Sequence, residues 1–158
     1  MKFATACVLS LVAAAAALAA GPVAPPKIAA VRAQLYYETK GTFSDDLLTQ
    51  KDLSLWNTII DEASAGGSSS ATLITVEVQG QNVGVGDVAV EVVATGLKNK
   101  VLGRTKMDVA LYDDKKTFFA PLMLTGTGCE EIKITARLTG KGAPKAAVVK
   151  TIPFQCGE

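Results

Sequence analysis

The sequence predicts an all-β fold: an antiparallel β-sandwich of seven or eight strands that follows a cleaved signal peptide. Three observations carry this prediction. From residue 71 onward, short segments alternate apolar and polar residues, and clusters of turn-forming residues separate them. The last two segments carry a cysteine at each outer end, as expected of a disulfide-stapled hairpin. No convincing helical pattern follows the signal peptide.

The N-terminal residues 1–20 predict export. Met1 and Lys2 give a positive start, residues 3–20 carry no charge, and the run Ala17-Leu18-Ala19 has the small residues that signal peptidase requires. A membrane anchor is the alternative, since about 18 uncharged residues can just span a bilayer. The alanine tract makes this segment only weakly hydrophobic, however. We therefore expect a secreted or periplasmic protein with no membrane span after cleavage.

The mature chain is expected to comprise a proline-rich tether over residues 21–26 and a single domain over residues 27–158. Removal of Lys2 from the 16 basic residues leaves as many basic as acidic residues, of which there are 15. The net charge is then near zero, and no basic run remains in the sequence. This composition argues against nucleic acid as a partner.

Cleavage also removes Cys7 and leaves Cys129 and Cys156 as an even pair. In an oxidising compartment such a pair favours a disulfide over a metal site or a catalytic thiol. Closing a loop of this span is expected to stabilise the fold by about 3–4 kcal/mol in a chain-entropy treatment. The disulfide is therefore expected to contribute substantially to stability.

Residues 27–38 are predicted to form the first strand. The spacing of their aliphatic residues would also permit a helix, but the adjacent Tyr36 and Tyr37 favour a strand. The segment that follows is less regular. Residues 41–46 have turn chemistry, since serine and aspartate side chains can bond their own backbone.

A short strand is expected over residues 53–60, because the leucines, isoleucines and tryptophan there are too apolar to be left in water. A helix beginning at Ser44 is the alternative, since Asp45 and Asp46 would favour its first turn. Residues 63–70 are rich in glycine and serine and predict a flexible loop.

Alternation is clean in the second half of the domain. The predicted strands cover residues 72–79, 88–94, 106–112 and 117–124, with a further short segment at 100–103. Turns are expected over residues 80–86 and 113–116. Pro121 interrupts the strand 117–124, and because proline lacks a backbone donor we expect this strand at a sheet edge or at a bulge.

The final hairpin raises a problem of register. Ile132, Ile134 and Leu138 share the apolar face of the first arm, which leaves Cys129 on the polar face. Cys156 falls on the apolar face of the returning arm. A flat ladder would hold the two sulfurs apart, so we expect a bulge near residues 126–128 or at Pro153.

The spacing of the strands resembles that of immunoglobulin-like and fibronectin-type sandwiches over most of the mature chain. The resemblance is one of architecture alone. The immunoglobulin order of cysteine, tryptophan and cysteine is absent, because Trp56 precedes both Cys129 and Cys156. The predicted disulfide would also join neighbouring strands of one hairpin. We find no internal repeat.

The residue content narrows the possible chemistry. The chain has no histidine, which excludes Ser-His-Asp and Cys-His catalysis and histidine-containing zinc sites. The glycine-rich run 80–86 lacks the lysine and helix of a phosphate-binding loop. Adjacent carboxylates occur at residues 45–46, 61–62, 113–114 and 130–131, but neighbours on a strand point to opposite faces and do not converge on one ion. We expect no cofactor and no metal site.

The candidate binding surface lies on paired aromatic residues and on the glycine–serine loop. On strands, Tyr36 and Tyr37 must point to opposite faces, and so must Phe118 and Phe119, so one ring of each pair can meet a protein or a sugar. The loop contributes Gly66, Gly67 and Ser68, since sandwiches often bind through loops at one end. Trp56 is interpreted as a core residue.

The sequence therefore favours a non-enzymatic binding or interaction module, whose partner is another protein or a surface glycan. A structural component of an envelope or matrix is one alternative. A hydrolase that uses carboxylates brought together by folding is another. The spacing of the acidic residues gives no support to the hydrolase.

Overall fold

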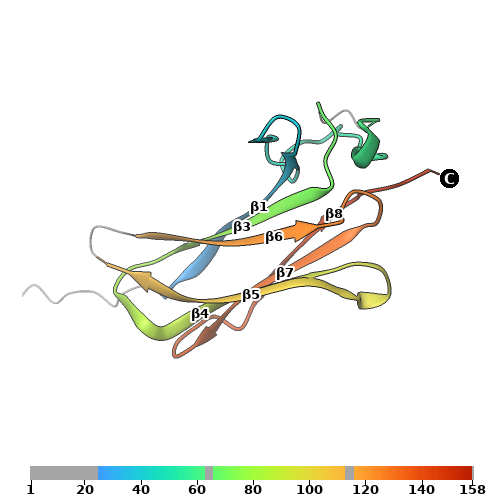
Figure 1. The fold of residues 1–158 in the computed structure, drawn as a ribbon. Helices are drawn as coiled ribbons and strands as arrows, with labels where there is room; N and C mark the ends of the chain where they lie inside the picture. The colour runs from blue at the N-terminus through green and yellow to red at the C-terminus, as the bar shows by residue number, and fades with distance from the viewer. Residues whose placement is uncertain (1–24, 63–65, 113–115, 158) are drawn as a thin grey trace, which may run out of the picture.

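The computed structural model describes residues 25–62, 66–112 and 116–157, which form two antiparallel sheets packed face to face (Figure 1). The strands are β1 (Lys27–Tyr37), β2 (Thr42–Phe43), β3 (Ala71–Gln79), β4 (Val83–Thr95), β5 (Val101–Leu111), β6 (Thr117–Thr125), β7 (Ile132–Gly140) and β8 (Ala147–Ile152). The first sheet has the order β2-β1-β3-β6 and the second the order β5-β4-β7-β8. The predicted all-β sandwich is confirmed. The predicted signal peptide lies outside the described residues, as do residues 21–24 of the tether.

Alternation along the strands decides which side chains fill the space between the sheets. In β3, Ile74, Val76 and Val78 are fully buried, while Thr75 and Glu77 point outward. The second sheet supplies the facing layer, which comprises Val88, Val90, Val92, Val109, Leu111, Ile132, Ile134, Ala136 and Ile152. Burial of each large aliphatic side chain contributes about 1.5–3 kcal/mol. The alternation that predicts the strands therefore also selects the residues that stabilise the core.

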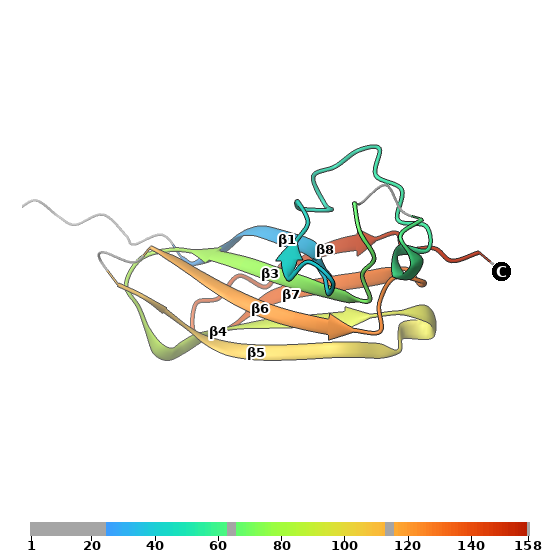
Figure 2. The same cartoon turned by 45° about the horizontal axis from the view of Figure 1, so that its top comes forward.

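The two sides of the sandwich are closed differently (Figure 2). On one side β5 runs alongside β6, and a Cβ placed on Gly103 would lie only 2.4 Å from Leu124 Cδ2. On the other side, residues 44–57 pass from the edge of β1 to the continuation of β8, and we call them the crossing segment. Its Leu47 N–H donates to Ala33 C=O (2.8 Å), and its Asn57 N–H donates to Gln155 C=O (2.8 Å). The crossing segment therefore joins the first sheet to the second.

Residues 53–60 do not form the predicted strand. A single parallel bridge joins Trp56 to Gln155. Asn57 then adopts a left-handed conformation with φ 47°, and the chain turns into the short 3-10 helix η1 (Thr58–Ile60). Asparagine tolerates this conformation better than most residues, and it ends the extended backbone there. The apolar pattern is nonetheless used, because Leu55 points into the core.

The chain reverses earlier after β1 than the sequence predicts. The N–H groups of Lys40 and Gly41 both donate to Tyr37 C=O, at 3.1 and 2.8 Å. Residues 42–43, predicted as part of a turn, therefore return as β2 beside the end of β1. Only the latter part of that turn remains, where Asp46 Oδ1 accepts the N–H of Leu48 (3.1 Å) in the expected aspartate turn.

Two other boundaries differ. The predicted turn over residues 80–86 is shorter, since β4 begins at Val83 and a register shift separates Val83 from Val88. The segments 100–103 and 106–112 form one strand, β5, preceded by the short 3-10 helix η2 (Leu97–Asn99). Predicted turn residues 113–115 lie outside the described residues. Pro121 lies on β6 at the edge of the first sheet, which confirms its predicted place.

The hairpin of β7 and β8 carries the predicted disulfide between Cys129 and Cys156. The ladder itself runs in unbroken register from Ile132 opposite Ile152 to Arg137 opposite Ala147, so the irregularity predicted near residues 126–128 or at Pro153 falls outside it. Both cysteines lie beyond the end of this ladder. The chain instead changes direction before β7, where Gly126 and Gly128 have positive φ angles of 67° and 116°. An irregular loop thus replaces the bulge.

Candidate functional site

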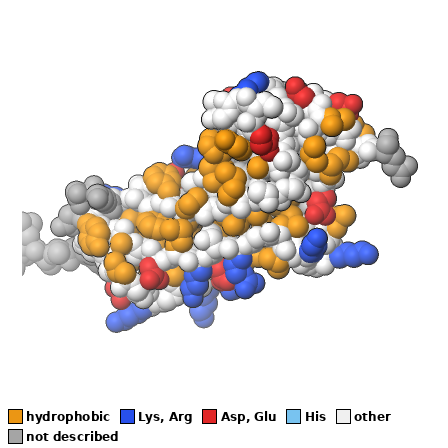
Figure 3. All heavy atoms as spheres, in the orientation of Figure 1, with side chains coloured by type: hydrophobic (Ala, Val, Ile, Leu, Met, Phe, Trp, Pro, Cys, Tyr) orange, Lys and Arg blue, Asp and Glu red, His pale blue; other side chains and the backbone are white. Residues whose placement is uncertain are grey.

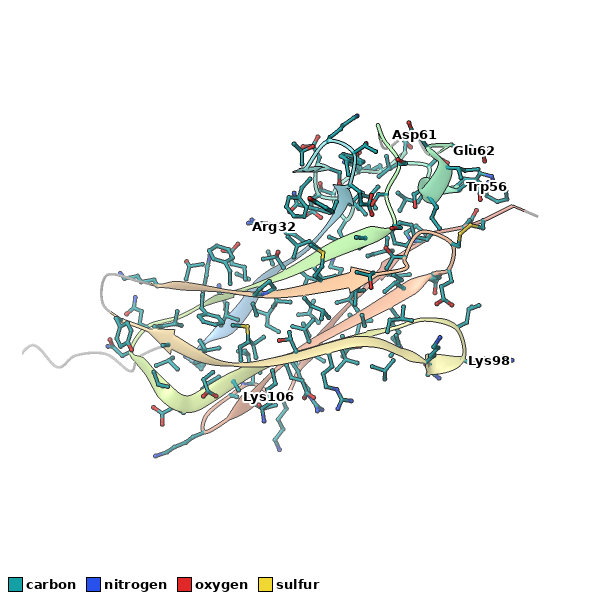
Figure 4. The ribbon with its side chains drawn as sticks, in the orientation of Figure 1. Arg32, Trp56, Asp61, Glu62, Lys98 and Lys106 are labelled. Carbon is teal, nitrogen blue, oxygen red and sulfur yellow. A yellow bond between two sulfur atoms is a disulfide. The ribbon has the colours of Figure 1, made fainter. Side chains whose placement is uncertain are left out.

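A short loop at the C-terminal end of the sandwich exposes large apolar side chains. We call residues 56–62 the Trp56 loop. Trp56, Ile59 and Ile60 in this loop are 42%, 44% and 64% exposed, so the interpretation of Trp56 as a core residue is wrong. Asp61 and Glu62 follow directly and are also exposed. Figure 4 shows Trp56, Asp61 and Glu62 close to one another at this end.

The backbone of the loop is fixed by two left-handed residues. Asn57 and Asp61 have φ angles of 47° and 63° and bracket η1. The Asn57 side chain donates from Nδ2 to Glu62 Oε2 (2.5 Å), and the Ile60 N–H donates to the Asn57 C=O (3.1 Å). Non-glycine residues in this region cost free energy that the surrounding contacts must offset, and they concentrate at functional sites. The loop is therefore a tightly bonded unit.

The C-terminal segment holds one side of the loop. Asn57 donates its N–H to Gln155 C=O, and its Oδ1 accepts the N–H of Gly157 at 3.0 Å. The Trp56 ring lies against Gly157, where an added Cβ would be 2.6 Å from Cζ2 of the ring. The ring is thus supported beneath by backbone, while much of it stays in contact with solvent.

The chain just before Cys129 holds the other side. Thr58 is completely buried, and its hydroxyl donates to Ser69 C=O (3.3 Å) or to Gly128 C=O (3.4 Å). A Cβ on Gly128 would lie 2.3 Å from Thr58 Oγ1. Gly128 adjoins Cys129, and Gly157 adjoins Cys156. The disulfide therefore joins the two segments that bond and pack against the Trp56 loop.

The predicted aromatic surface is only partly available. Tyr37 is buried, whereas Tyr36 lies on the outer face of the first sheet with its ring 5.2 Å from the ring of Phe43. Phe118 packs against the core, and Phe119 is 50% exposed. Each pair therefore sends one ring to each face, as the alternation predicts. The register also places Tyr36 and Phe119 near opposite ends of the sheet.

The predicted glycine–serine loop packs on Tyr37. Gly67 is buried, and a Cβ there would lie 3.1 Å from Tyr37 Cδ1. Lys40 donates from Nζ to the C=O of Gly66 and lies 5.3 Å from the centre of the Tyr37 ring. Burial raises the pKa of the Tyr37 phenol. Of the predicted loop residues, Gly66 is exposed and Ser68 is half-buried, whereas residues 63–65 lie outside the described residues.

Ser70 ties the end of this loop to the first strand. Its N–H and hydroxyl both donate to Glu38 Oε1, at 2.9 and 2.8 Å. Burial raises the pKa of Glu38, but these hydrogen bonds outweigh it and hold the pKa below its usual value. Residues 66–70 are therefore anchored at both ends instead of forming the flexible loop that their composition predicts.

The outer faces of the two sheets differ in chemistry. On the first sheet, Leu73, Phe119, Pro121 and Met123 form an apolar strip along β3 and β6. On the second sheet, Glu91 on β4 faces Lys106 on β5 and Arg137 on β7. Figure 3 shows hydrophobic side chains over β6 and lysine and arginine side chains over the second sheet. Sequence alone missed this charged face, because its members come from three separate strands.

Glu91 is the centre of the charged face. Its Oε2 lies 2.6 Å from Arg137 Nη2 and accepts a hydrogen bond from Arg137 Nε at 2.7 Å. This hydrogen bond lowers the pKa of Glu91, and the charges of Arg137, Arg104 and Lys106 lower it further. The arrangement is that of a cross-strand ion pair on an exposed sheet.

Two members of the acidic pairs, Asp46 and Glu130, accept backbone N–H groups. Asp46 Oδ1 accepts the N–H groups of Ala33 (3.0 Å) and Leu48 (3.1 Å). Glu130 Oε2 accepts the N–H of Leu97 (3.3 Å). Within residues 25–62, 66–112 and 116–157, no group of three or more carboxylates or cysteines is placed to hold a metal ion.

A groove lies on the side of the sandwich where the crossing segment runs. Its volume is about 420 Å³, and it is lined by residues 28–32 of β1, Leu48 and Thr49 of the crossing segment, and Val148 and Lys150 of β8. We call it the β1–β8 groove. A second hollow of about 420 Å³ lies at the N-terminal end beside Pro25 and Pro26. A third, of about 230 Å³, lies beside η2.

Comparison with known proteins assigns the chain to no family. No family model matches the chain, and no curated protein matches it. A crystal structure assigned as a β-galactosidase from Bacteroides fragilis is similar over 67% of this chain, with 20% identity and a TM-score of 0.40, and the similar region is 15% of that protein. A similarity at this level supports no statement about activity. In the part of the chain that the structure describes, none of the helices has the length and apolar character needed to span a membrane.

Proposed function

We propose that the protein is an exported, non-catalytic binding module that contacts another protein through the Trp56 loop. The observation that carries this proposal is the exposure of Trp56, Ile59 and Ile60 on a loop whose backbone is bonded on both sides. Tryptophan is enriched at the energetic centres of protein interfaces. A loop that is already ordered loses little conformational entropy on binding.

The composition of the loop favours a protein over a glycan. A sugar presents hydroxyl groups around its ring, and these lose hydrogen bonds to water when they are placed against aliphatic side chains. Ile59 and Ile60 beside Trp56 would impose that cost. An apolar pocket bordered by basic groups would bury the same side chains and place its charges near Asp61 and Glu62.

Export is the second part of the proposal, and it rests on the N-terminal sequence. Isolation of the protein from its own source, followed by N-terminal sequencing, is expected to show a mature chain that begins at Ala20 or Gly21. A chain that still begins at Met1 and stays with the cytoplasmic fraction would reject the proposal of export. It would also remove the oxidising compartment that the disulfide requires.

A double variant, Trp56→Ala with Ile60→Ser, tests the binding surface. Loss of such an anchor typically costs about 2 kcal/mol or more, roughly a thirty-fold rise in Kd. Proteins captured by the wild-type chain are identified, and binding of each purified protein is then measured by calorimetry. The double variant is expected to lose binding while its melting temperature stays within a few degrees of the wild type.

Leu97→Ser is the matched control, because Leu97 is 65% exposed and Ile60 is 64% exposed. Leu97 lies in η2, at the turn between β4 and β5. This control is expected to leave Kd unchanged. Equal binding by the Trp56→Ala, Ile60→Ser variant and the wild type would reject the Trp56 loop as the contact surface, and so would equal losses in both variants.

A further inference from the structure

The crossing segment leaves part of the β1 edge uncovered. Where the segment lies beside β1, it bonds the outward groups of Ala33 and Leu35, with Ser44 donating to Leu35 C=O at 2.9 Å. Backbone groups that point away from the neighbouring strand recur at every second residue. Val31 is therefore the next residue whose backbone N–H and C=O point away from β3. Among the described residues, no strand, backbone group or side chain bonds Val31 on this side.

The uncovered edge forms one wall of the β1–β8 groove. Five consecutive residues, 28–32, line this wall, and Val31 among them is 7% exposed. Ile28, Leu48 and Val148 form apolar parts of the groove, and all three are partly buried against the core. A strand added beside β1 would lie about 4.8 Å from it and would cover these side chains.

The groove also contains a cation. Lys150 on β8 pairs with Ile134 on β7. Its side chain is exposed and lines the groove. The two ion pairs of the described residues are Arg32 with Glu77 and Arg137 with Glu91, so Lys150 belongs to neither. Asp46 is the carboxylate of the groove, and its Oδ1 is already bonded to two backbone N–H groups. The ammonium group of Lys150 is therefore the group in the groove that can pair with a carboxylate of a ligand.

We propose that an extended, acidic segment of a partner protein binds in the β1–β8 groove by adding a strand to the edge of β1. The N–H and C=O of Val31 bond the backbone of this segment, and Lys150 pairs with one of its carboxylates. Small apolar side chains of the segment cover Ile28 and Val148. This contact is separate from the Trp56 loop and does not depend on it.

A loose segment fits the groove better than a second copy of this chain. The edge of β1 is recessed between β8 and the crossing segment, so two β1 edges cannot approach each other without displacing these elements. The β5 edge of a second copy would bring Arg104 and Lys106 to the groove, and these cations would repel Lys150. The register shift between Ile28 and Ala30 further limits pairing with a long regular strand.

The test uses short capped peptides of about seven residues, the length of an average strand. One alternates valine and serine around a central aspartate, a second has lysine in place of the aspartate, and a third carries N-methyl groups along one edge. The aspartate peptide is expected to shift the NMR signals of the Val31 and Lys150 amides. We expect the lysine peptide to bind roughly three- to ten-fold more weakly, because a partly exposed ion pair is lost. N-methylation of the pairing edge should abolish binding.

Charge reversal in the protein completes the test. Lys150→Glu is expected to reverse the preference, so that the lysine peptide binds more tightly than the aspartate peptide. Lys106→Glu, on the outer face of the second sheet, is the matched control and should leave the preference unchanged. The proposal would be overturned by amide shifts confined to other strands, by equal binding of the N-methylated peptide, or by no shift at about 1 mM peptide. Groove signals that change with protein concentration alone would assign the groove to a second copy and would also overturn it.

Discussion

The two sides of this sandwich show how regular and irregular closure differ in what they leave exposed. Along one side, β5 and β6 lie together and cover each other. Along the other, the crossing segment spans the gap, buries Leu47 and Leu55, and leaves the β1–β8 groove open. The crossing segment also leads directly into the Trp56 loop. Both proposed contact surfaces therefore lie on the irregular side, where connecting backbone instead of a packed strand faces solvent.

Removal of the disulfide is expected to destabilise the irregular side of the sandwich strongly. The double variant Cys129→Ser, Cys156→Ser is expected to lose about 3–4 kcal/mol of unfolding free energy, because a bridge with sequence separation 27 restricts the unfolded chain. Urea denaturation measures this change. The released segments hold the Trp56 loop, so the loop should also loosen while the sheets remain intact.

Trp56 reports on that loosening directly, since it is the only tryptophan in the chain. In the double variant under native conditions, we expect its fluorescence emission to shift to the red as contact with Gly157 is lost. Far-ultraviolet circular dichroism should keep its strand signal. If the emission spectrum is identical to that of the wild type, the hydrogen bonds hold the loop without the disulfide, and the coupling inferred between them is wrong.

Two glycines, Gly126 and Gly128, test the packing beneath the Trp56 loop. Gly128→Ala adds a Cβ that would lie 2.3 Å from Thr58 Oγ1, beneath the Trp56 loop, whereas Gly126→Ala meets nothing within 4 Å. Both positions have positive φ, so both variants carry a backbone cost of about 1 kcal/mol. We expect Gly128→Ala to lose roughly 1–3 kcal/mol more, from overpacking.

The measurement is the urea midpoint together with the Trp56 emission. Gly126→Ala should lower the midpoint slightly and leave the emission unchanged. Gly128→Ala should lower the midpoint further and change the emission, because Thr58 is displaced. Equal midpoints and equal spectra in the two variants would show that the loop does not depend on its packing against Gly128.

The regular parts of the fold could be predicted from sequence, and the irregular parts could not. Strands such as β3 and β7 follow from alternation alone, because one face of each is buried. Pairing of Cys129 with Cys156 follows from an even cysteine count and the flanking arms. In the crossing segment, apolar residues such as Leu47 and Leu55 reach the core from a backbone without a repeating period. Periodicity therefore carries no information about their placement.

The candidate site was missed for a related reason. Trp56 is large and apolar, which favours burial, but its ring is supported by Gly157, more than a hundred residues later in the chain. No local pattern predicts that contact. Asn57 and Asp61 were a usable signal, since both residue types tolerate the left-handed conformation that ends a strand. The charged face of the second sheet was likewise hidden, because Glu91 and Arg137 meet only through the sheet register.

The smallest predicted effect concerns the charged face of the regular second sheet. Arg137 holds the pKa of Glu91 below its ordinary value in the folded protein. Stability from this pair is therefore present above the unfolded pKa and is lost as the pH falls through the folded pKa. Because the Arg137 side chain is 55% exposed, we expect no more than about 0.5 kcal/mol. Urea midpoints of the wild type and Glu91→Gln should differ at pH 7 and converge near pH 3, and Arg137→Gln should behave like Glu91→Gln. A difference that persists at pH 3 would show that Glu91 acts through packing on the sheet instead of through its charge.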